Sequence, residues 1–157
     1  MKIGILGGSF DPIHNGHIHM ALAACDKFAL DQLWLIPAGH SPNKDEKSMT
    51  DAIHRYHMCE LAAKADHRLR VSRVEIDSEE RSYTYRTLQK ITEEHPENRF
   101  YFILDALGGR KQRIDAIAYL FDISAAGHQV LALDIRDPVL IPFAQKLTDF
   151  HSCVPFL

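Results

Sequence analysis

The sequence has few cysteines and little net charge, and both absences narrow the class of protein. Its three cysteines, Cys25, Cys59 and Cys153, are widely spaced and form neither a CxxC pair nor a zinc-ligand pattern. Cys25 and Cys59 fall within apolar helical patterns, so we expect buried, reduced thiols there. The formal net charge of −3 gives no reason to expect nucleic acid or an anionic membrane as the main partner.

The sequence also lacks a segment suited to a membrane. No apolar run approaches the roughly 18 residues needed to span a bilayer. The first residues lead directly into a strand pattern, without the basic and apolar regions of a signal peptide. We therefore expect a cytoplasmic protein with no membrane and no nucleic-acid partner, and self-association into a homo-oligomer is compatible with the sequence.

Length and composition favour a single globular domain. The chain has 157 residues, of which 46% are apolar and 25% charged, close to the average for soluble domains. Internal repeats, low-complexity segments and Gly/Ser linkers are absent from the sequence. We expect one domain over residues 1–157.

Strand and helix patterns alternate along this domain. In the helix expected to start at Thr50 or Asp51, the apolar stripe is Ile53, Tyr56 or His57, Met58 and Leu61. The alternation predicts an α/β fold with a Rossmann-like, doubly wound and mainly parallel sheet. Strands are expected at 2–6, 32–37, 69–76, 100–104 and 130–133, and helices at 17–28, 51–65, 84–94 (capped by Ser82 or Thr84), 114–121 and 138–147.

The most informative motif, GGSFDPIHNGH at residues 7–17, follows the first expected strand. Gly7 and Gly8 allow backbone amides to approach a ligand closely. Gly16 opens the next helix, whose free N–H groups and dipole favour a bound phosphate. His14 and His17 are three residues apart, so both imidazoles can stabilise charge that develops on one phosphoryl group. This pattern predicts a phosphate site at the carboxyl end of the strand.

Other interpretations of these histidines remain open. Both could simply pack or cap the helix. A metal site formed by His14, His17 and His19 is a further alternative, but imidazoles beside a glycine-rich anion turn suit phosphate better than a metal cage.

The motif resembles the signature of the HxGH nucleotidyltransferase superfamily, with the HxGH element at residues 14–17. Its GGSFDP part and His14 make it similar to the bacterial nicotinate-nucleotide adenylyltransferase family. The resemblance implies that His14 and His17 are catalytic and that ATP arrives with Mg²⁺. It places the ATP phosphates on Gly7, Gly8, Ser9, Phe10 and Gly16.

Three further segments carry the resemblance, which covers residues 2–104. The IPA…SPNK stretch is similar to a family loop in which a basic residue, here Lys44, meets substrate phosphate; without that context Lys44 would be a solvated side chain. Ser82, Tyr83 and Thr84 match a segment that holds the nicotinate ring and carboxylate, although they could also cap a helix. Arg55 matches a family helix, and we expect Arg55 and Glu75 to be structural.

After Leu104 the sequence departs from the family pattern. The family continues with GAD, which contacts adenosine, whereas this chain has Asp105, Ala106 and Leu107, so Asp105 is the expected stand-in. The family's C-terminal SxTxxR element is absent and the chain is shorter than usual, as in a shortened paralogue or an altered reading frame.

These features lead to one main hypothesis and two alternatives. The main hypothesis is an adenylyltransferase that joins nicotinate mononucleotide to the AMP part of ATP and releases pyrophosphate. The first alternative is a nucleotide-binding paralogue that has lost turnover. The second is a related enzyme with another phosphate acceptor, such as the amide mononucleotide.

Overall fold

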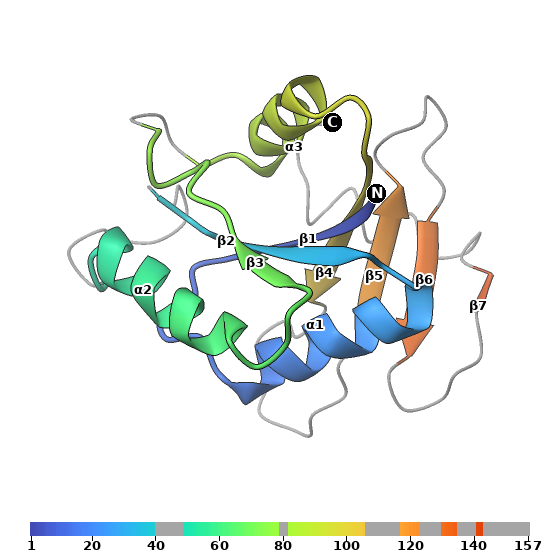
Figure 1. Cartoon of the computed structure of the whole chain (residues 1–157), viewed down its shortest axis with the longest axis horizontal. Coiled ribbons are helices and arrows are strands. Elements are labelled where there is room, and N and C mark those ends of the chain that lie inside the picture. The colour runs from blue at the N-terminus through green and yellow to red at the C-terminus, as the bar shows by residue number, and fades with distance from the viewer. Residues whose placement is uncertain (40–48, 79–81, 106–116, 123–129, 135–140, 143–157) are drawn as a thin grey trace.

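The elements of the fold alternate between strand and helix as far as the fourth strand (Figure 1). The computed structural model describes residues 1–39, 49–78, 82–105, 117–122, 130–134 and 141–142. In chain order the elements in these ranges are β1 Lys2–Gly8, α1 Asn15–Phe28, β2 Gln32–Pro37, α2 Ala52–Ala63, β3 Leu69–Val71, α3 Thr84–Glu94, β4 Arg99–Asp105, β5 Ile117–Asp122, β6 Val130–Asp134 and β7 Ile141–Pro142.

One sheet contains all of these strands, in the order β3-β2-β1-β4-β5-β6-β7. The four strands from β3 to β4 pair in parallel, which confirms the predicted Rossmann-like α/β class. From β4 to β7 the pairs are antiparallel, an arrangement that the sequence pattern did not predict. β1 therefore lies inside the sheet, between β2 and β4.

The helix predicted over residues 114–121 is wrong, because residues 117–122 form strand β5. In this strand Tyr119 lies opposite Leu104, and Leu120 lies opposite Ile103. A short apolar run cannot be assigned to helix or strand by periodicity alone, and the aromatic residues in this run favour the extended form. The strand predicted at 130–133 is confirmed as β6.

Two other predicted elements differ from the structure. The strand expected over residues 69–76 stops at Val71, and residues 74–77 form a turn in which the Asp77 amide donates to the Arg73 carbonyl at 2.9 Å. The helix expected over 138–147 is wrong at Ile141–Pro142, which pairs with β6. The rest of that segment lies outside the described residues.

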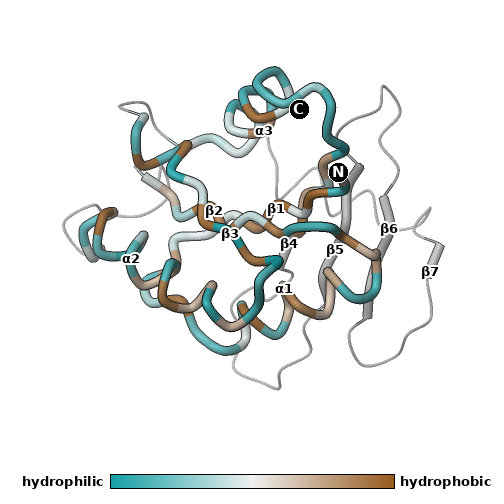
Figure 2. Tube along the Cα trace, in the orientation of Figure 1, coloured by the Kyte–Doolittle hydropathy of each residue, from teal (hydrophilic) through white to brown (hydrophobic). Residues whose placement is uncertain are grey.

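Two apolar clusters hold the helices on the sheet, one on each face. Figure 1 shows α1 and α2 on one face and α3 on the other. The side chains of β1 alternate between the clusters: Leu6 belongs to the one that contains α1 residues such as Ala21, while Ile3 and Ile5 join Ile91 of α3. Figure 2 shows hydrophobic residues along the central strands and hydrophilic ones on the outer turns of α3. The doubly wound arrangement thus follows from strands that are apolar on both faces.

The buried face of α2 is not the predicted apolar stripe. Leu61, expected in the stripe, is 65% exposed, whereas Arg55 and Cys59 are buried. Arg55 and Cys59 are four residues apart and so lie on one side of the helix. Because Arg55 is polar, a pattern of apolar residues could not show that its side chain is buried.

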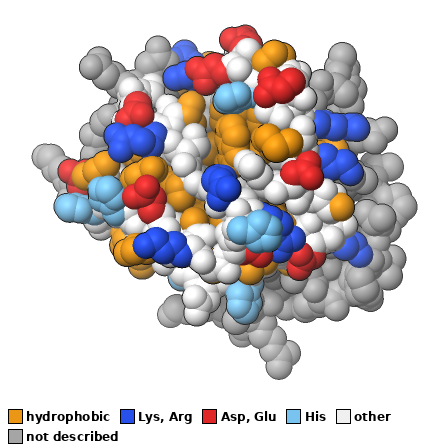
Figure 3. All heavy atoms as spheres, viewed as in Figure 1, with side chains coloured by type: hydrophobic (Ala, Val, Ile, Leu, Met, Phe, Trp, Pro, Cys, Tyr) orange, Lys and Arg blue, Asp and Glu red, His pale blue; other side chains and the backbone are white. Residues whose placement is uncertain are grey.

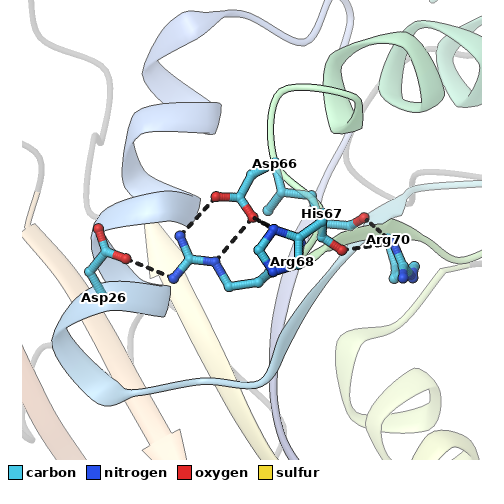
Figure 4. Close-up of polar contacts among 6 residues, drawn as sticks. Asp26, Asp66, His67, Arg68 and Arg70 are labelled. Carbon is cyan, nitrogen blue, oxygen red and sulfur yellow. Dashed lines mark hydrogen bonds and ion pairs between the residues drawn. The ribbon is translucent and has the colours of Figure 1, made fainter.

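An ion-pair network fastens the turn before β3 to the end of α1 (Figure 4). The Arg68 guanidinium contacts Asp26 of α1 at 2.7 Å and Asp66 at 2.8 Å. Hydrogen bonds from Arg68 hold the pKa of the Asp66 carboxyl well below its ordinary value. This network lies at the end of α1 opposite to its histidines.

The surface shown in Figure 3 carries acidic and basic side chains side by side, without a region of one sign. This distribution agrees with the small formal net charge of −3. None of the helices in the described part of the chain is both long and apolar enough to cross a lipid bilayer.

Candidate functional site

The glycine-rich turn lies where the strand order of the sheet changes direction. β2 pairs with one edge of β1 and β4 with the other, and all three strands run in parallel. Ligands of α/β sheets bind beyond the carboxyl ends of strands at such a point. The Ala38 amide donates to the Gly8 carbonyl at 2.9 Å, which joins the ends of β1 and β2. Gly7 is exposed at this edge, so its backbone is accessible to a ligand.

Phe10 fills the inside of the turn and supports His17. Its side chain is 2% exposed, and its backbone has a φ of 44°, in the left-handed region. A Cβ atom on Gly8 would lie 3.1 Å from the Phe10 ring, so a glycine at position 8 leaves room for that ring. The ring meets the His17 imidazole edge-on, with centroids 5.1 Å apart. Gly8 and Phe10 thus act together to place His17.

His14 and His17 form one unit at the start of α1. His14 is the N-cap residue, and the two imidazoles stack with centroids 3.7 Å apart and an angle of 25° between their planes. The His14 amide donates to Nδ1 of His17 at 3.2 Å. Because Nδ1 accepts this bond, Nε2 is the nitrogen of a neutral His17 that carries hydrogen.

The start of α1 is suited to an anion. Its first turn contains no acidic residue, and its first N–H groups carry the positive end of the helix dipole. Gly16 lies within this turn, against the His14 ring. Within the described residues, no three His, Cys, Asp or Glu side chains gather as a metal site would require. The geometry favours two imidazole donors beside a phosphate.

A buried arginine from α2 reaches the same turn. Arg55 is 1% exposed and donates from Nη1 to the Ser9 carbonyl at 2.6 Å. Nη2 donates to the carbonyl of Ala38 at 2.6 Å, and Nε to that of Thr50 at 2.8 Å. Burial lowers the pKa of the Arg55 guanidinium, and Asp11 opposes this effect. These contacts agree with the expected structural role of Arg55, and they place it next to the candidate site.

The residues predicted to hold the nicotinate ring and carboxylate lie at the start of α3, on the other face of the sheet. Ser82 accepts a hydrogen bond from the Gly39 amide at 3.1 Å, which joins α3 to the end of β2. The N-cap of α3 is Tyr83, without a side-chain bond to the helix, so the predicted capping by Ser82 or Thr84 is wrong. The Ser82 hydroxyl therefore bonds to a distant segment and not to the backbone of its own helix. Tyr83 and Thr84 are exposed.

Glu75 lies next to this segment. Its Oε1 accepts from the Thr87 hydroxyl at 2.7 Å. Burial raises the pKa of the Glu75 carboxyl, while hydrogen bonds from Thr87, Ser82 and Gly39 act against the rise. Glu75 was expected to be structural, and its contacts hold the 74–77 turn against α3.

The hollows of the described part differ in their relation to the predicted residues, as two of them show. One of about 340 Å³ is lined by Glu75, Ser82, Tyr83 and Thr87 among others. A larger one of about 830 Å³ lies between α2 and β3 and contains none of the residues predicted for the site. Of these two hollows, the smaller one thus contains two of the predicted residues, Ser82 and Tyr83.

Two of the predicted site residues lie wholly or partly outside the described residues. Lys44 lies outside the described residues. Asp105 ends β4, at the same edge of the sheet as Gly8, but its side chain is outside the described part. Sequence reasoning missed Asp11, whose Oδ2 accepts from the Thr50 amide at 3.0 Å, and Gly39. The signal for Gly39 was a glycine two residues after the end of a predicted strand.

A family model and curated relatives match this chain over much of its length. The profile of the cytidylyltransferase-like family matches residues 5–118. The chain is similar to probable nicotinate-nucleotide adenylyltransferases, with 48% identity over 99 residues in Clostridium botulinum (strain Loch Maree / Type A3) and 43% over 105 residues in Clostridium novyi (strain NT). These alignments cover 63% and 67% of this chain and 49% and 52% of the relatives. The chain thus spans about half the length of the curated relatives it matches.

A solved structure is similar over the same part. Plasmodium falciparum nicotinic acid mononucleotide adenylyltransferase complexed with NaAD has a TM-score of 0.56 and 26% identity, covering 64% of this chain and 50% of that one. The family profile matches well over half of the chain, and the fold and the glycine-rich turn are both present. On these grounds the chain belongs to the cytidylyltransferase-like family.

Proposed function

We propose that this chain transfers the adenylyl group of ATP to nicotinate mononucleotide. A phosphate oxygen of the mononucleotide attacks the α-phosphorus of ATP, the bond from that phosphorus to the bridging oxygen breaks, and pyrophosphate leaves. The product is nicotinate adenine dinucleotide, an intermediate of NAD biosynthesis. The observation that carries the proposal is the stacked pair of His14 and His17 at the N-terminus of α1.

The two histidines fit this reaction because it needs positioning and charge stabilisation more than a covalent nucleophile. Negative charge grows on the phosphoryl oxygens in the transition state, and donors aimed at them lower the barrier. Backbone amides of the Gly7–Phe10 turn and of Gly16 would hold the phosphates together with Lys44. ATP would enter as its Mg²⁺ complex, so this ion belongs to the substrate.

The proposal that nicotinate mononucleotide is the acceptor of the adenylyl group rests on residues other than the two histidines. Ser82, Tyr83 and Thr84 are proposed to hold the nicotinate ring and carboxylate, with Asp105 on the adenosine side. Support comes from the hydrogen bond between Ser82 and Gly39, which connects this segment to the end of β2. The end of β2 lies beside the segment between β1 and α1 (residues 9–14, the histidine turn), which carries His14 and leads to His17. The names of the relatives point to the same acceptor. The cytoplasm expected from the sequence is the proposed location of this reaction.

The test is pyrophosphate release by the purified full chain with MgATP and nicotinate mononucleotide, together with chromatographic detection of the dinucleotide. Removing one transition-state donor should lower kcat by about 10²–10³-fold, so His14→Ala and His17→Ala should each show such a loss. His19→Ala is the matched control, because His19 is an exposed histidine of the same helix. Its activity should stay close to that of the wild type.

The same experiment decides between the proposal and its alternatives. ATP binding without any dinucleotide at high enzyme concentration would mean a nucleotide-binding paralogue without turnover. The departure of the sequence after Leu104 makes this outcome worth measuring. Faster turnover with the amide mononucleotide would instead show that the Ser82–Thr84 assignment was wrong.

A further inference from the structure

Arg55 connects three segments that are distant in the sequence. Its guanidinium donates to the carbonyls of Ser9 in the histidine turn and of Thr50 before α2. It also donates to Ala38 at 2.6 Å and Gly39 at 3.4 Å, both after β2. Because the side chain is only 1% exposed, water does not compete for these bonds. One side chain thus fixes the spacing of three loops at the carboxyl edge of the sheet.

Charge neutralisation does not explain this arginine. Within the described ranges no carboxylate lies in ion-pair contact with Arg55, although Asp11 attracts it from a greater distance. Its contacts are carbonyl oxygens, whose positions are set by the backbone. A planar guanidinium has five N–H donors in a rigid fork and can therefore impose a geometry on several carbonyls at once.

A second hydrogen bond also joins the histidine turn to the start of α2. The Asp11 carboxylate accepts from the Thr50 amide at 3.0 Å, so the histidine turn and the start of α2 are joined twice. The carbonyls of Gly39 and Thr50 also flank the segment that contains Lys44, and Arg55 holds both. The spacing between the histidine turn and each end of that segment is thus fixed by the same cation.

We propose that Arg55 is a positioning residue for the proposed reaction, setting the histidine turn against the loops that follow β2 and precede α2. It touches no substrate and acts through the backbone of Ser9, Ala38 and Thr50. This inference rests on the proposed function for its effect on turnover, but not for its effect on the geometry of the histidines. A lysine at position 55 keeps the charge and loses the fork, so it separates positioning from charge.

The first measurement compares Arg55→Lys with Arg68→Lys. Arg68 is the matched control, because it also joins separate segments but contacts Asp26 and Asp66 at the other end of α1. A misplacement of about 1 Å can lower a rate by about 10²-fold. We expect Arg55→Lys to lower kcat by about 10–100-fold at a temperature where the protein is fully folded, with a smaller change in KM for ATP. Arg68→Lys should leave kcat unchanged.

The second measurement does not depend on turnover. In NMR spectra of the imidazole nitrogens, assigned by His14→Ala and His17→Ala, the signals of His14 and His17 should shift in Arg55→Lys and stay in place in Arg68→Lys. A folded Arg55→Lys with unshifted histidine signals would overturn the inference, as would equal losses of kcat in both variants. If the wild type has no transferase activity but the signals still shift, the proposed function fails while the positioning role stands.

Discussion

Gly16 lies against His14 so closely that no other residue fits at position 16 without moving the ring. A Cβ atom at this position would be 3.1 Å from both Cε1 and Nδ1 of His14. That spacing is shorter than most contacts made by real Cβ atoms, so the imidazole would have to shift by a few tenths of an ångström. The glycine of the HxGH element therefore has a steric reason, in addition to the access that it gives to backbone amides.

Gly16→Ala should separate stability from activity. Within a helix, alanine is more favourable than glycine by up to about 1 kcal/mol, so the free energy of unfolding should stay the same or rise. The displaced His14 ring should lower kcat by about 10-fold or more in the pyrophosphate assay. Denaturant unfolding and kcat are measured on the same samples. A variant with lower stability and unchanged kcat would contradict the steric role.

Gly39→Ala should destabilise the fold near residues 82–84, the segment proposed to hold the nicotinate group. A Cβ atom on Gly39 would overlap the backbone carbonyl oxygen of Glu75, and a backbone atom cannot move aside as a flexible side chain can. We expect a loss of about 1–3 kcal/mol in unfolding free energy, as for other overpacked sites. Gly7→Ala is the control for stability, because its Cβ would meet only Phe102, at 3.9 Å. Equal stability of the two variants in urea would refute this expectation.

The sequence predicted the parallel half of the fold and the place of the histidine turn because both depend on local signals. Strand β2 was expected at the residues where it occurs, and α1 begins within two residues of its expected start. Apolar strands and a glycine-rich turn are local patterns, and parallel pairing follows from the alternation with helices. The edge of the sheet at which His14 and His17 lie follows from the same alternation.

What could not be predicted depends on contacts between distant residues. Arg55 lies in a helix whose apolar stripe was expected on another face, and its burial is explained only by the carbonyls of Ser9 and Ala38. Ser82 or Thr84 was the expected cap of α3, whereas the Ser82 hydroxyl accepts from the Gly39 amide, 43 residues away in the sequence. A local apolar pattern predicts a helix at strand β5, because its antiparallel partner β4 is not visible in that pattern.

Glu75 should make stability depend on pH with a defined sign. Burial raises the pKa of its carboxyl above 4.5 in the folded protein, and in the unfolded chain we take the pKa to be ordinary. Between the two values the folded state binds more protons, so stability is lost as pH rises through this window. The stability of the wild type relative to Glu75→Gln should therefore fall as the pH rises above the ordinary carboxyl range, measured by urea unfolding at several pH values.

Asp77→Asn is the control with the opposite sign. Hydrogen bonds from Arg73 lower the pKa of Asp77 below 3.8, so its contribution is lost as pH falls and changes little above about pH 5. If the difference between wild type and Glu75→Gln stayed constant over the whole range, burial would not govern the pKa of Glu75.

The two buried thiols should resist alkylation until the protein unfolds. Burial raises the pKa of Cys25 to about 11 and that of Cys59 to about 12, and both side chains are at most 1% exposed. At pH 8 only about one Cys25 in 10³ is a thiolate, and the thiolate is the reactive form.

In a Cys153→Ser background, iodoacetamide should leave the folded protein unmodified and add two groups in denaturant, counted by mass spectrometry. Leu61→Cys in the same background controls for the reagent, because Leu61 is 65% exposed and a thiol there should react in the folded state. Rapid double labelling of the folded protein would contradict the burial of Cys25 beneath α1 and of Cys59 beneath α2.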